Sequence, residues 1–168
     1  APDDHRPTVH DHFGYSVAAV TETRTVVASA LGADPKAIFD NKGHGQRQSL
    51  GAVYVFVEDG IGGWAQQAKL VPSDGFAGDL FGHSVSADQD TIVVSADSSA
   101  YVYRRNTDGT WKQEAKLRLQ KAAKGNGVYV PHVSVNGDTV AVGASWQKGG
   151  GAVFIFERSL KRGRIPAW

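Results

Sequence analysis

The sequence predicts an all-β fold, built as a partial β-propeller of about three four-stranded antiparallel blades. Three observations support it. Short sequence motifs, called words below, recur in one order. They are rich in β-branched and aromatic residues, and Gly, Asp and Asn turn signals separate them. Four strands in about 40–50 residues is the period of a propeller blade. A blade buries its faces only against neighbouring blades, so we expect the repeats to stack.

Three of the recurring words read as strands, because β-branched and aromatic side chains pack well on a pleated sheet. A third, looser copy of these words follows the first two. The words are FGYSV (13–17) and FGHSV (81–85); TVVASA (25–30) and TIVVSA (91–96); AVYVF (52–56) and AYVY (100–103); and, in the third copy, VSV (133–135), DTVAVGAS (138–145) and GAVFIF (151–156). Turn signals such as residues 58–60 and 107–109 predict antiparallel pairing of neighbouring strands.

The fourth word is WAQQAKL at residues 64–70 and WKQEAKL at residues 111–117. In the second copy Trp111, Gln113, Ala115 and Leu117 alternate with charged residues, which predicts that these four side chains share one buried face. Because Trp64 and Trp111 recur at one position, we expect both to pack between blades, with stacking on a sugar as the alternative.

The chain is read as a single domain with units at about residues 13–80, 81–130 and 131–160 and terminal tails at residues 1–12 and 161–168. The first unit is longer because it carries an insertion at residues 31–50, which is predicted to be a long surface loop. The third unit lacks the Trp word, so the chain has too few blades to close a ring. We therefore expect completion by self-association or by further blades of a longer chain, or by residues 1–12 acting as a missing outer strand.

Charge and hydropathy exclude several classes of partner. The formal net charge is +1 at pH 7, which gives no strong attraction to nucleic acid, and the basic run at residues 161–164 reads as a solvated tail. No apolar run approaches the roughly 18 residues that span a bilayer, so no membrane insertion is expected. The absence of Cys removes disulfide and thiol chemistry.

These words resemble the FG-GAP repeat family, whose blades occur in integrin α-subunit propellers and in many secreted proteins. Residues 13–14 and 81–82 supply the Phe-Gly pair, residues 142–145 stand at the family's second motif, and the Trp word is similar to a non-integrin branch. The resemblance covers about residues 13–157 and implies a propeller with a secreted or cell-surface location. The turns at residues 20–23, 87–90 and 136–138 lack the alternating oxygen ligands of integrin-type calcium loops, so no calcium and no other cofactor is expected.

Recognition is predicted on the rim where the strand 2 to 3 turns and the strand 4 to 1 links emerge, since loops on a rigid scaffold carry binding. This rim would bring the insertion at residues 31–50 beside the links at residues 71–80 and 120–128. The expected ligand-binding residues are Asp34, Phe39, Asp40, Asn41, Lys42, His44, Arg47, Asp74, Asp79 and Trp146. For Asp74 and Asp79 a structural role in the blade link is the alternative.

The leading functional prediction is a non-catalytic, extracellular, lectin- or adhesion-like module that binds a glycan or glycoprotein. The alternative is a protein-interaction or assembly module whose open blade edge is completed by another chain. No serine-hydrolase elbow, zinc-protease signature or phosphate loop is present, so no enzyme and no catalytic residue is predicted. His10 and His12 leave metal binding open, without a third ligand fixed by spacing, and His83 is expected to pack between blades or line the channel.

Overall fold

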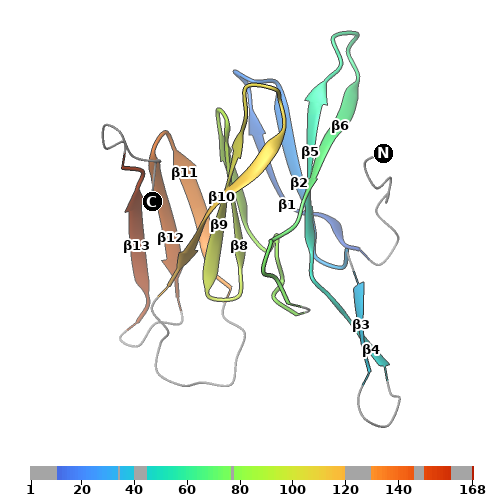
Figure 1. Cartoon of the computed structure of the whole chain (residues 1–168). Helices are drawn as coiled ribbons and strands as arrows, with labels where there is room; N and C mark the ends of the chain where they lie inside the picture. The colour runs from blue at the N-terminus through green and yellow to red at the C-terminus, as the bar shows by residue number, and fades with distance from the viewer. Residues whose placement is uncertain are drawn as a thin grey trace.

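The computed structural model confirms the all-β prediction. It describes residues 11–33, 35–39, 45–76, 78–119, 130–145, 150–159 and 168. Within these ranges the chain forms antiparallel sheets of four, four, three and two strands and no helix (Figure 1). No sheet closes on itself, in agreement with a partial propeller.

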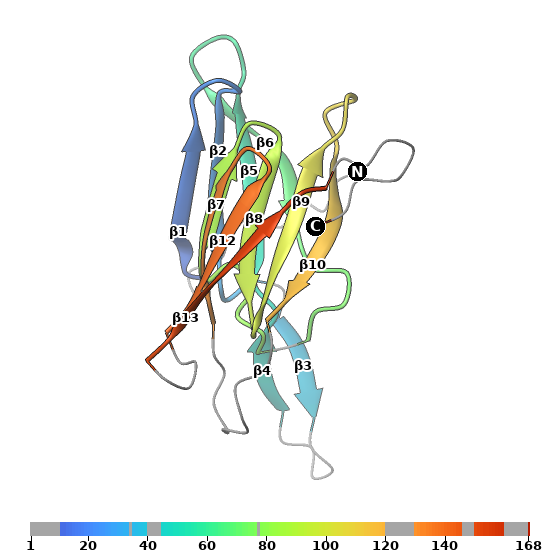
Figure 2. The same ribbon diagram turned by 90° about the vertical axis from the view of Figure 1, so that its left-hand side faces the viewer.

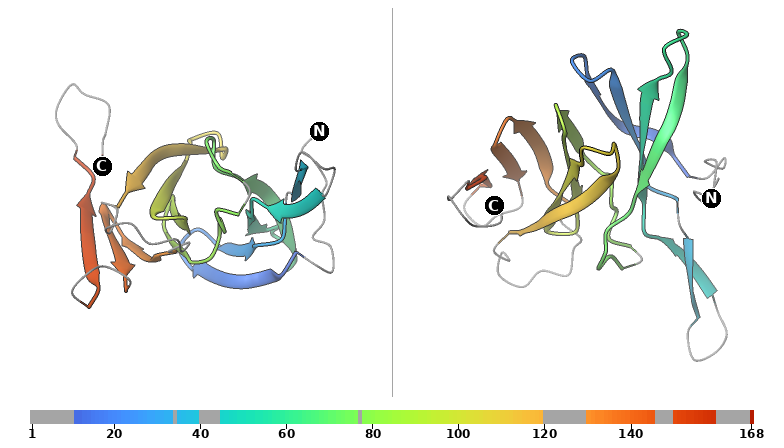
Figure 3. Two further views of the ribbon diagram at one scale, coloured as in Figure 1. Left: turned by 90° about the horizontal axis from the view of Figure 1, so that it is seen from below. Right: turned by 45° about the horizontal axis from the view of Figure 1, so that its top comes forward.

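The three larger sheets follow one another along the chain as blades 1, 2 and 3 (Figure 3). Blade 1 has the order β1-β2-β5-β6, blade 2 the order β7-β8-β9-β10 and blade 3 the order β11-β12-β13. The strand bounds are β1 (Phe13–Val20), β2 (Thr25–Ala30), β5 (Ala52–Glu58), β6 (Trp64–Leu70), β7 (Val85–Asp88), β8 (Thr91–Ala96), β9 (Ser99–Arg105), β10 (Trp111–Arg118), β11 (His132–Asn136), β12 (Thr139–Ala144) and β13 (Ala152–Glu157). The first strand of each blade contacts the next one, β1 with β7 and β7 with β11, so the blades fan out from this inner edge. Figure 2 shows β1 and β7 on the same side of the molecule.

The insertion at residues 31–50 is not the irregular loop that the sequence suggested. Strands β3 (Pro35–Phe39) and β4 (Gly45–Ser49) pair antiparallel, with Pro35 opposite Ser49 and Phe39 opposite Gly45. This hairpin projects away from blade 1 at the lower end of Figure 1. Pairing the backbone groups of a long insertion is more favourable than leaving them without partners, which explains the hairpin.

The prediction of one buried face along residues 111–117 was wrong, because β10 contains a β-bulge. Gln113 pairs with Tyr103 and Ala115 pairs with Val102, which leaves Glu114 as the extra residue. The bulge reverses the alternation, so Trp111 packs toward blade 1 whereas Leu117 packs toward blade 3. An equivalent bulge in β6 makes Gln67 the extra residue, since Gln66 pairs with Phe56 and Ala68 with Val55.

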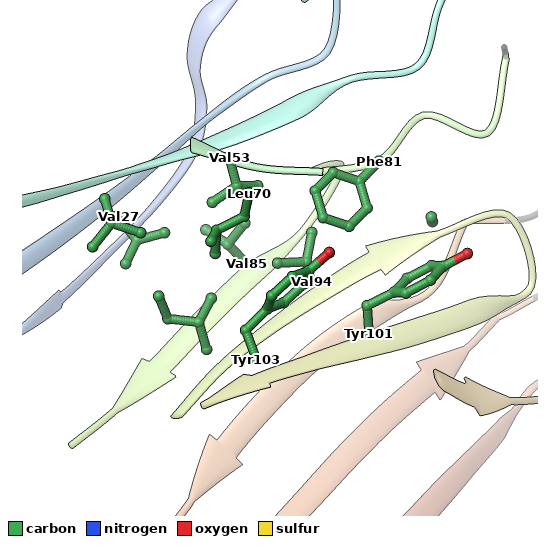
Figure 4. Close-up of a cluster of buried hydrophobic side chains, with 11 residues drawn as sticks. Val27, Val53, Leu70, Phe81, Val85, Val94, Tyr101 and Tyr103 are labelled. Atoms are coloured by element: carbon green, nitrogen blue, oxygen red, sulfur yellow. The ribbon is translucent and has the colours of Figure 1, made fainter. Parts of the chain in front are cut away.

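Two hydrophobic cores hold the blades together, one on each side of blade 2. The first core cluster lies between blades 1 and 2 and comprises Val27, Val53, Val55, Leu70, Phe81, Val85, Ile92, Val94, Ala96, Tyr101 and Tyr103 (Figure 4). The second lies between blades 2 and 3 and comprises Val93, Ala100, Val102, Leu117, Leu119, Val135, Val140, Val142 and Ala144. Strand β8 contributes to both and is buried along its whole length, as a strand covered on both faces must be.

Serine side chains connect the inner strands of successive blades. The Ser16 hydroxyl oxygen accepts a hydrogen bond from the Val85 N–H of the next blade at 3.1 Å. Ser84, at the same position of blade 2, accepts from the Val133 N–H of blade 3 at 3.2 Å. In blades 1 and 2 a serine of the second strand accepts in turn from the first-strand serine: Ser29 from the Ser16 N–H and Ser95 from the Ser84 N–H. The recurring serines therefore fix the spacing between blades.

Replacing the aromatic residue of the Phe-Gly pair should have unequal effects in the two blades. Phe81 is fully buried and packs edge-to-face on Tyr101 and Tyr103, whereas Phe13 makes the same contacts with Tyr54 and Phe56 but is 46% exposed. We expect Phe81→Ala to lower the free energy of unfolding by about 3–5 kcal/mol and Phe13→Ala by about 1 kcal/mol. Urea denaturation measures both, and equal losses would contradict the assignment of the first core.

Candidate functional site

Each blade has two flanks, and blade 1 exposes one of them. We call the face toward the preceding blade the leading flank and the opposite face the trailing flank. The leading flank of blade 1 carries Phe13, Val17, Tyr54, Phe56 and Trp64, at positions that match Phe81, Val85, Tyr101, Tyr103 and Trp111 in blade 2. The same surface can therefore be compared in blade 2, where blade 1 precedes it, and in blade 1, where no blade precedes it among the described residues.

The comparison shows that part of the leading flank of blade 1 is uncovered, whereas Tyr54 is 1% exposed because it packs in a third buried cluster with Ala30, Ala33 and Ala52. Phe13, Val17 and Trp64 are 46%, 64% and 53% exposed, whereas Phe81 and Val85 are 0% and 7% exposed. In blade 2 the Trp111 indole N–H donates to the Gln67 side-chain oxygen of blade 1 at 2.9 Å. Trp64 has the same position in the repeat but points to no preceding blade among the described residues.

The glycines of the two Phe-Gly pairs differ in the same way. Both have positive φ, +85° for Gly14 and +98° for Gly82, which favours glycine at each site. A Cβ atom on Gly82 would lie 2.8 Å from the Ser29 Cβ of blade 1, whereas one on Gly14 would meet no atom of the described residues within 4 Å. Blade 1 therefore fills the space in front of Gly82, and the equivalent space in front of Gly14 holds no described residue.

The trailing flank of blade 3 is open as well. Val153 and Ile155 of β13 are 69% and 59% exposed, and their counterparts Val53 and Val55 in blade 1 are fully buried by blade 2. Both ends of the blade stack thus expose apolar side chains that are covered wherever a neighbour is present. Large apolar surface of this kind is typical of an interaction site.

On the loop rim the structure brings the blade link beside the base of the insertion, as the sequence predicted. The Gly78 N–H donates to the Ser49 carbonyl at 2.9 Å and the Phe81 N–H donates to the Leu50 carbonyl at 3.1 Å. Two apolar residues of this link, Val71 and Phe76, are exposed.

Two of the predicted binding residues, Asp74 and Asp79, have contacts that stabilise the link. The Asp74 carboxylate accepts from the Lys116 ammonium at 2.9 Å and from the Tyr101 hydroxyl at 3.0 Å, and Arg118 lies 3.8 Å away. The Asp79 carboxylate accepts from the Phe76 N–H at 2.7 Å. A ligand at either carboxylate would compete with these bonds, so the structural alternative has direct support and a binding role stays a prediction.

The side chains of the other predicted binding residues lie outside the described part of the structure. Phe39 and Arg47 lie in β3 and β4, but their side chains are outside the described residues. The remaining predicted residues also lie outside them, as do His10 and the link at residues 120–128: Asp34, Asp40, Asn41, Lys42, His44 and Trp146. Within the described ranges no group of three or more His, Asp and Glu gathers to hold a metal ion.

His83 packs at the inner edge of the blades, as expected. Its ring centroid lies 5.4 Å from that of Tyr15 in blade 1 and 5.6 Å from that of His132 in blade 3. Burial, and then the neighbouring His132, lower the pKa of His83. A mainly neutral imidazole at neutral pH is compatible with this aromatic packing.

Removing the Asp74 carboxylate should change the response of the protein to acid. The hydrogen bond from Lys116 lowers the pKa of Asp74, so its stabilising contribution is present above the unfolded pKa of about 4 and is lost as pH falls below it. We expect Asp74→Asn to lower the melting temperature at pH 7 and to reduce the further loss between pH 5 and pH 2, two values chosen to bracket this titration. Thermal melts across this range give the measurement, and an unchanged pH profile would show that the ion pair contributes nothing.

Comparison with known proteins agrees with the repeat structure. Residues 64–107 match the family model of the FG-GAP repeat, and they span β6 of blade 1 and β7, β8 and β9 of blade 2. No curated protein matches the chain. FG-GAP repeats are typical of propeller-like, generally non-enzymatic interaction modules in extracellular or cell-surface proteins. A search of the described residues for a helix able to cross a bilayer finds none. The chain therefore contains an FG-GAP repeat, at residues 64–107.

Proposed function

We propose that this protein is a non-catalytic interaction module that binds a second copy of itself head to tail through the leading flank of blade 1. One observation carries the proposal: Phe13, Val17 and Trp64 are exposed at positions that blade 1 covers in blade 2. Burial of such apolar and aromatic surface is the main source of favourable free energy in protein association.

The trailing flank of blade 3 offers the matching surface. Val153 and Ile155 occupy the positions of Val53 and Val55, which pack against Phe81, Tyr101 and Tyr103 inside the molecule. A head-to-tail contact would thus repeat a contact that the chain already makes. Two copies would supply about six blades, within the range of closed propellers, and a closing rotation gives a finite ring.

Charged substitutions on the two flanks test this arrangement. We expect sedimentation velocity to show a concentration-dependent dimer for the wild type, and Phe13→Asp or Ile155→Asp to leave mainly monomer because each buries a charge in the contact. Ile61→Asp is the matched control, since Ile61 is 91% exposed in the turn between β5 and β6 and lies on neither flank.

Mixing the two flank variants tests the head-to-tail geometry itself. Phe13→Asp keeps an intact trailing flank and Ile155→Asp keeps an intact leading flank, so an equal mixture should form dimers that neither variant forms alone. A wild type that stays monomeric over the whole concentration range would overturn the proposal. Dimers in either single variant would place the interface elsewhere.

A second candidate function is recognition of a glycan or glycoprotein by the loop rim outside the cell. The β3–β4 hairpin extends this rim beside the link at residues 71–80, where Phe76 is 74% exposed. An exposed aromatic ring beside polar loop residues can stack on a sugar while the polar groups bind hydroxyls. The FG-GAP repeat, found in extracellular and cell-surface proteins, is compatible with this setting.

Shortening the hairpin tests the second candidate without disturbing blade 1. The Gly51 N–H donates to the Ala33 carbonyl at 3.0 Å, so the two ends of the insertion already lie together. We expect replacement of residues 35–48 by a short Gly-Ser turn to abolish binding on a glycan array and to leave self-association unchanged. Binding that survives the replacement, or a wild type that binds no glycan, would exclude a hairpin-dependent lectin.

A further inference from the structure

Among the described residues, blade 3 has no fourth strand, whereas its two neighbours have one. In blades 1 and 2 the third strand is covered by β6 and β10, whereas among the described residues β13 pairs only with β12. Among these residues the other edge of β13 has no partner strand, and the backbone groups of such an edge can pair with an added strand.

A cavity lies beside this edge, between blades 2 and 3. Its volume is about 620 Å³, and its lining includes Arg104, Asn106, Lys112, Gln113 and Glu114 of the β9–β10 hairpin together with Arg158 at the end of β13. The corresponding position between blades 1 and 2 is filled, because Trp111 packs there against the first core cluster.

Glu114 is the equivalent of Gln67, since each is the bulge residue of its fourth strand. The Gln67 side-chain oxygen accepts the indole N–H of Trp111 at 2.9 Å. In Glu114 one carboxylate oxygen, Oε1, accepts from Arg158 at 2.9 Å. The other, Oε2, is buried and has no hydrogen-bond partner among the described residues, which is an energetically costly state for a polar atom.

Arg158 of blade 3 is likewise the equivalent of Arg105 of blade 2. Their backbone N–H groups donate to the carbonyls of Asp138 and Asp90, at 2.8 Å and 2.9 Å. The Arg105 guanidinium carbon lies 4.9 Å from the centre of the Trp111 ring, whereas Arg158 borders the cavity and pairs with Glu114. The cavity therefore has both groups that bind a tryptophan in the preceding interface: a cation for the ring face and an acceptor for the indole N–H.

We propose that an extended strand led by a tryptophan adds antiparallel to this edge of β13 and donates its indole N–H to Glu114. The partner strand has the chemistry of the fourth strands β6 and β10, with Trp first, Gln two positions later and Leu six positions later. Trp168 also packs against the second core cluster, but its indole N–H has no hydrogen-bond partner among the described residues, so it does not supply this donor. This strand site goes beyond the head-to-tail contact, because it uses the backbone edge of β13 and Glu114, whereas the head-to-tail contact uses the side chains of Val153 and Ile155.

A labelled peptide with the sequence of residues 111–118 tests the site on the full chain. Fluorescence anisotropy should show saturable binding, and replacing the peptide's Trp by Ala should weaken it about tenfold or more, because a buried ring and a hydrogen bond are lost. Glu114→Gln keeps an acceptor, as Gln67 does, and should retain binding. Glu114→Ala should weaken binding by a similar factor, and Gln67→Ala is the matched control without effect.

Hydrogen exchange locates the bound peptide, with protection expected over Ala152–Glu157 of β13. Absence of saturable binding, equal affinity of the Trp-free peptide, or protection confined to β1 would each overturn the proposal. The Trp-free peptide is tested on the wild type, so this result does not depend on the folding of any variant. Binding should persist in the Phe13→Asp variant, so failure of self-association and failure of strand addition give different results.

Discussion

The structure depends on one constraint: a blade can bury its flanks only against another blade. Blade 2 meets this constraint on both sides, and its second strand β8 is consequently buried throughout. Blades 1 and 3 meet it on one side only, which leaves Phe13 and Trp64 exposed at one end of the stack and Val153 and Ile155 at the other. The features that we connect with function follow from this imbalance, because the chain exposes surfaces that its own repeat has evolved to cover.

The polar contacts between blades continue only in part to the end of the stack. Blades 1 and 2 each have a serine on the first and second strands, and the first-strand serine binds the backbone of the following blade. In blade 3 these positions are His132 and Gly143, which supply no hydroxyl group. A second serine contact does have an equivalent, because Ser86 accepts from the Val135 N–H at 3.0 Å and Ser134 stands at the position of Ser86 in blade 3. A chain that docks on the trailing flank of blade 3 would therefore be held by burial of Val153 and Ile155 and by fewer polar contacts than blades 2 and 3 make.

The sequence was sufficient for the strands of the blades and their antiparallel pairing, because repetition reports packing that no single segment reveals, but it did not predict the β3–β4 hairpin. The recurring Phe-Gly pair and the recurring Trp predicted interfaces between blades, and Phe81 and Trp111 lie there. The bulges at Gln67 and Glu114 could not be predicted from alternation, since an extra residue reverses every following side chain without a composition signal. Exposure at the two ends could also not be predicted from the sequence, because Phe13 and Phe81 belong to motifs that differ at one position only, and the contrast in exposure comes from the presence or absence of a preceding blade.

The difference between Gln67 and Glu114 shows how one repeat position acquires two roles. A neutral amide is sufficient at Gln67 because Trp111 completes its hydrogen bonding within the chain. A carboxylate at Glu114 needs cations, and Arg158 and Arg104 lie near it at 2.9 Å and 3.9 Å. These ion pairs lower the cost of the buried charge but leave one oxygen without a donor. A partner that brings an N–H group to this oxygen removes a cost already present in the unbound protein, and so gains more there than from an equal hydrogen bond on open surface.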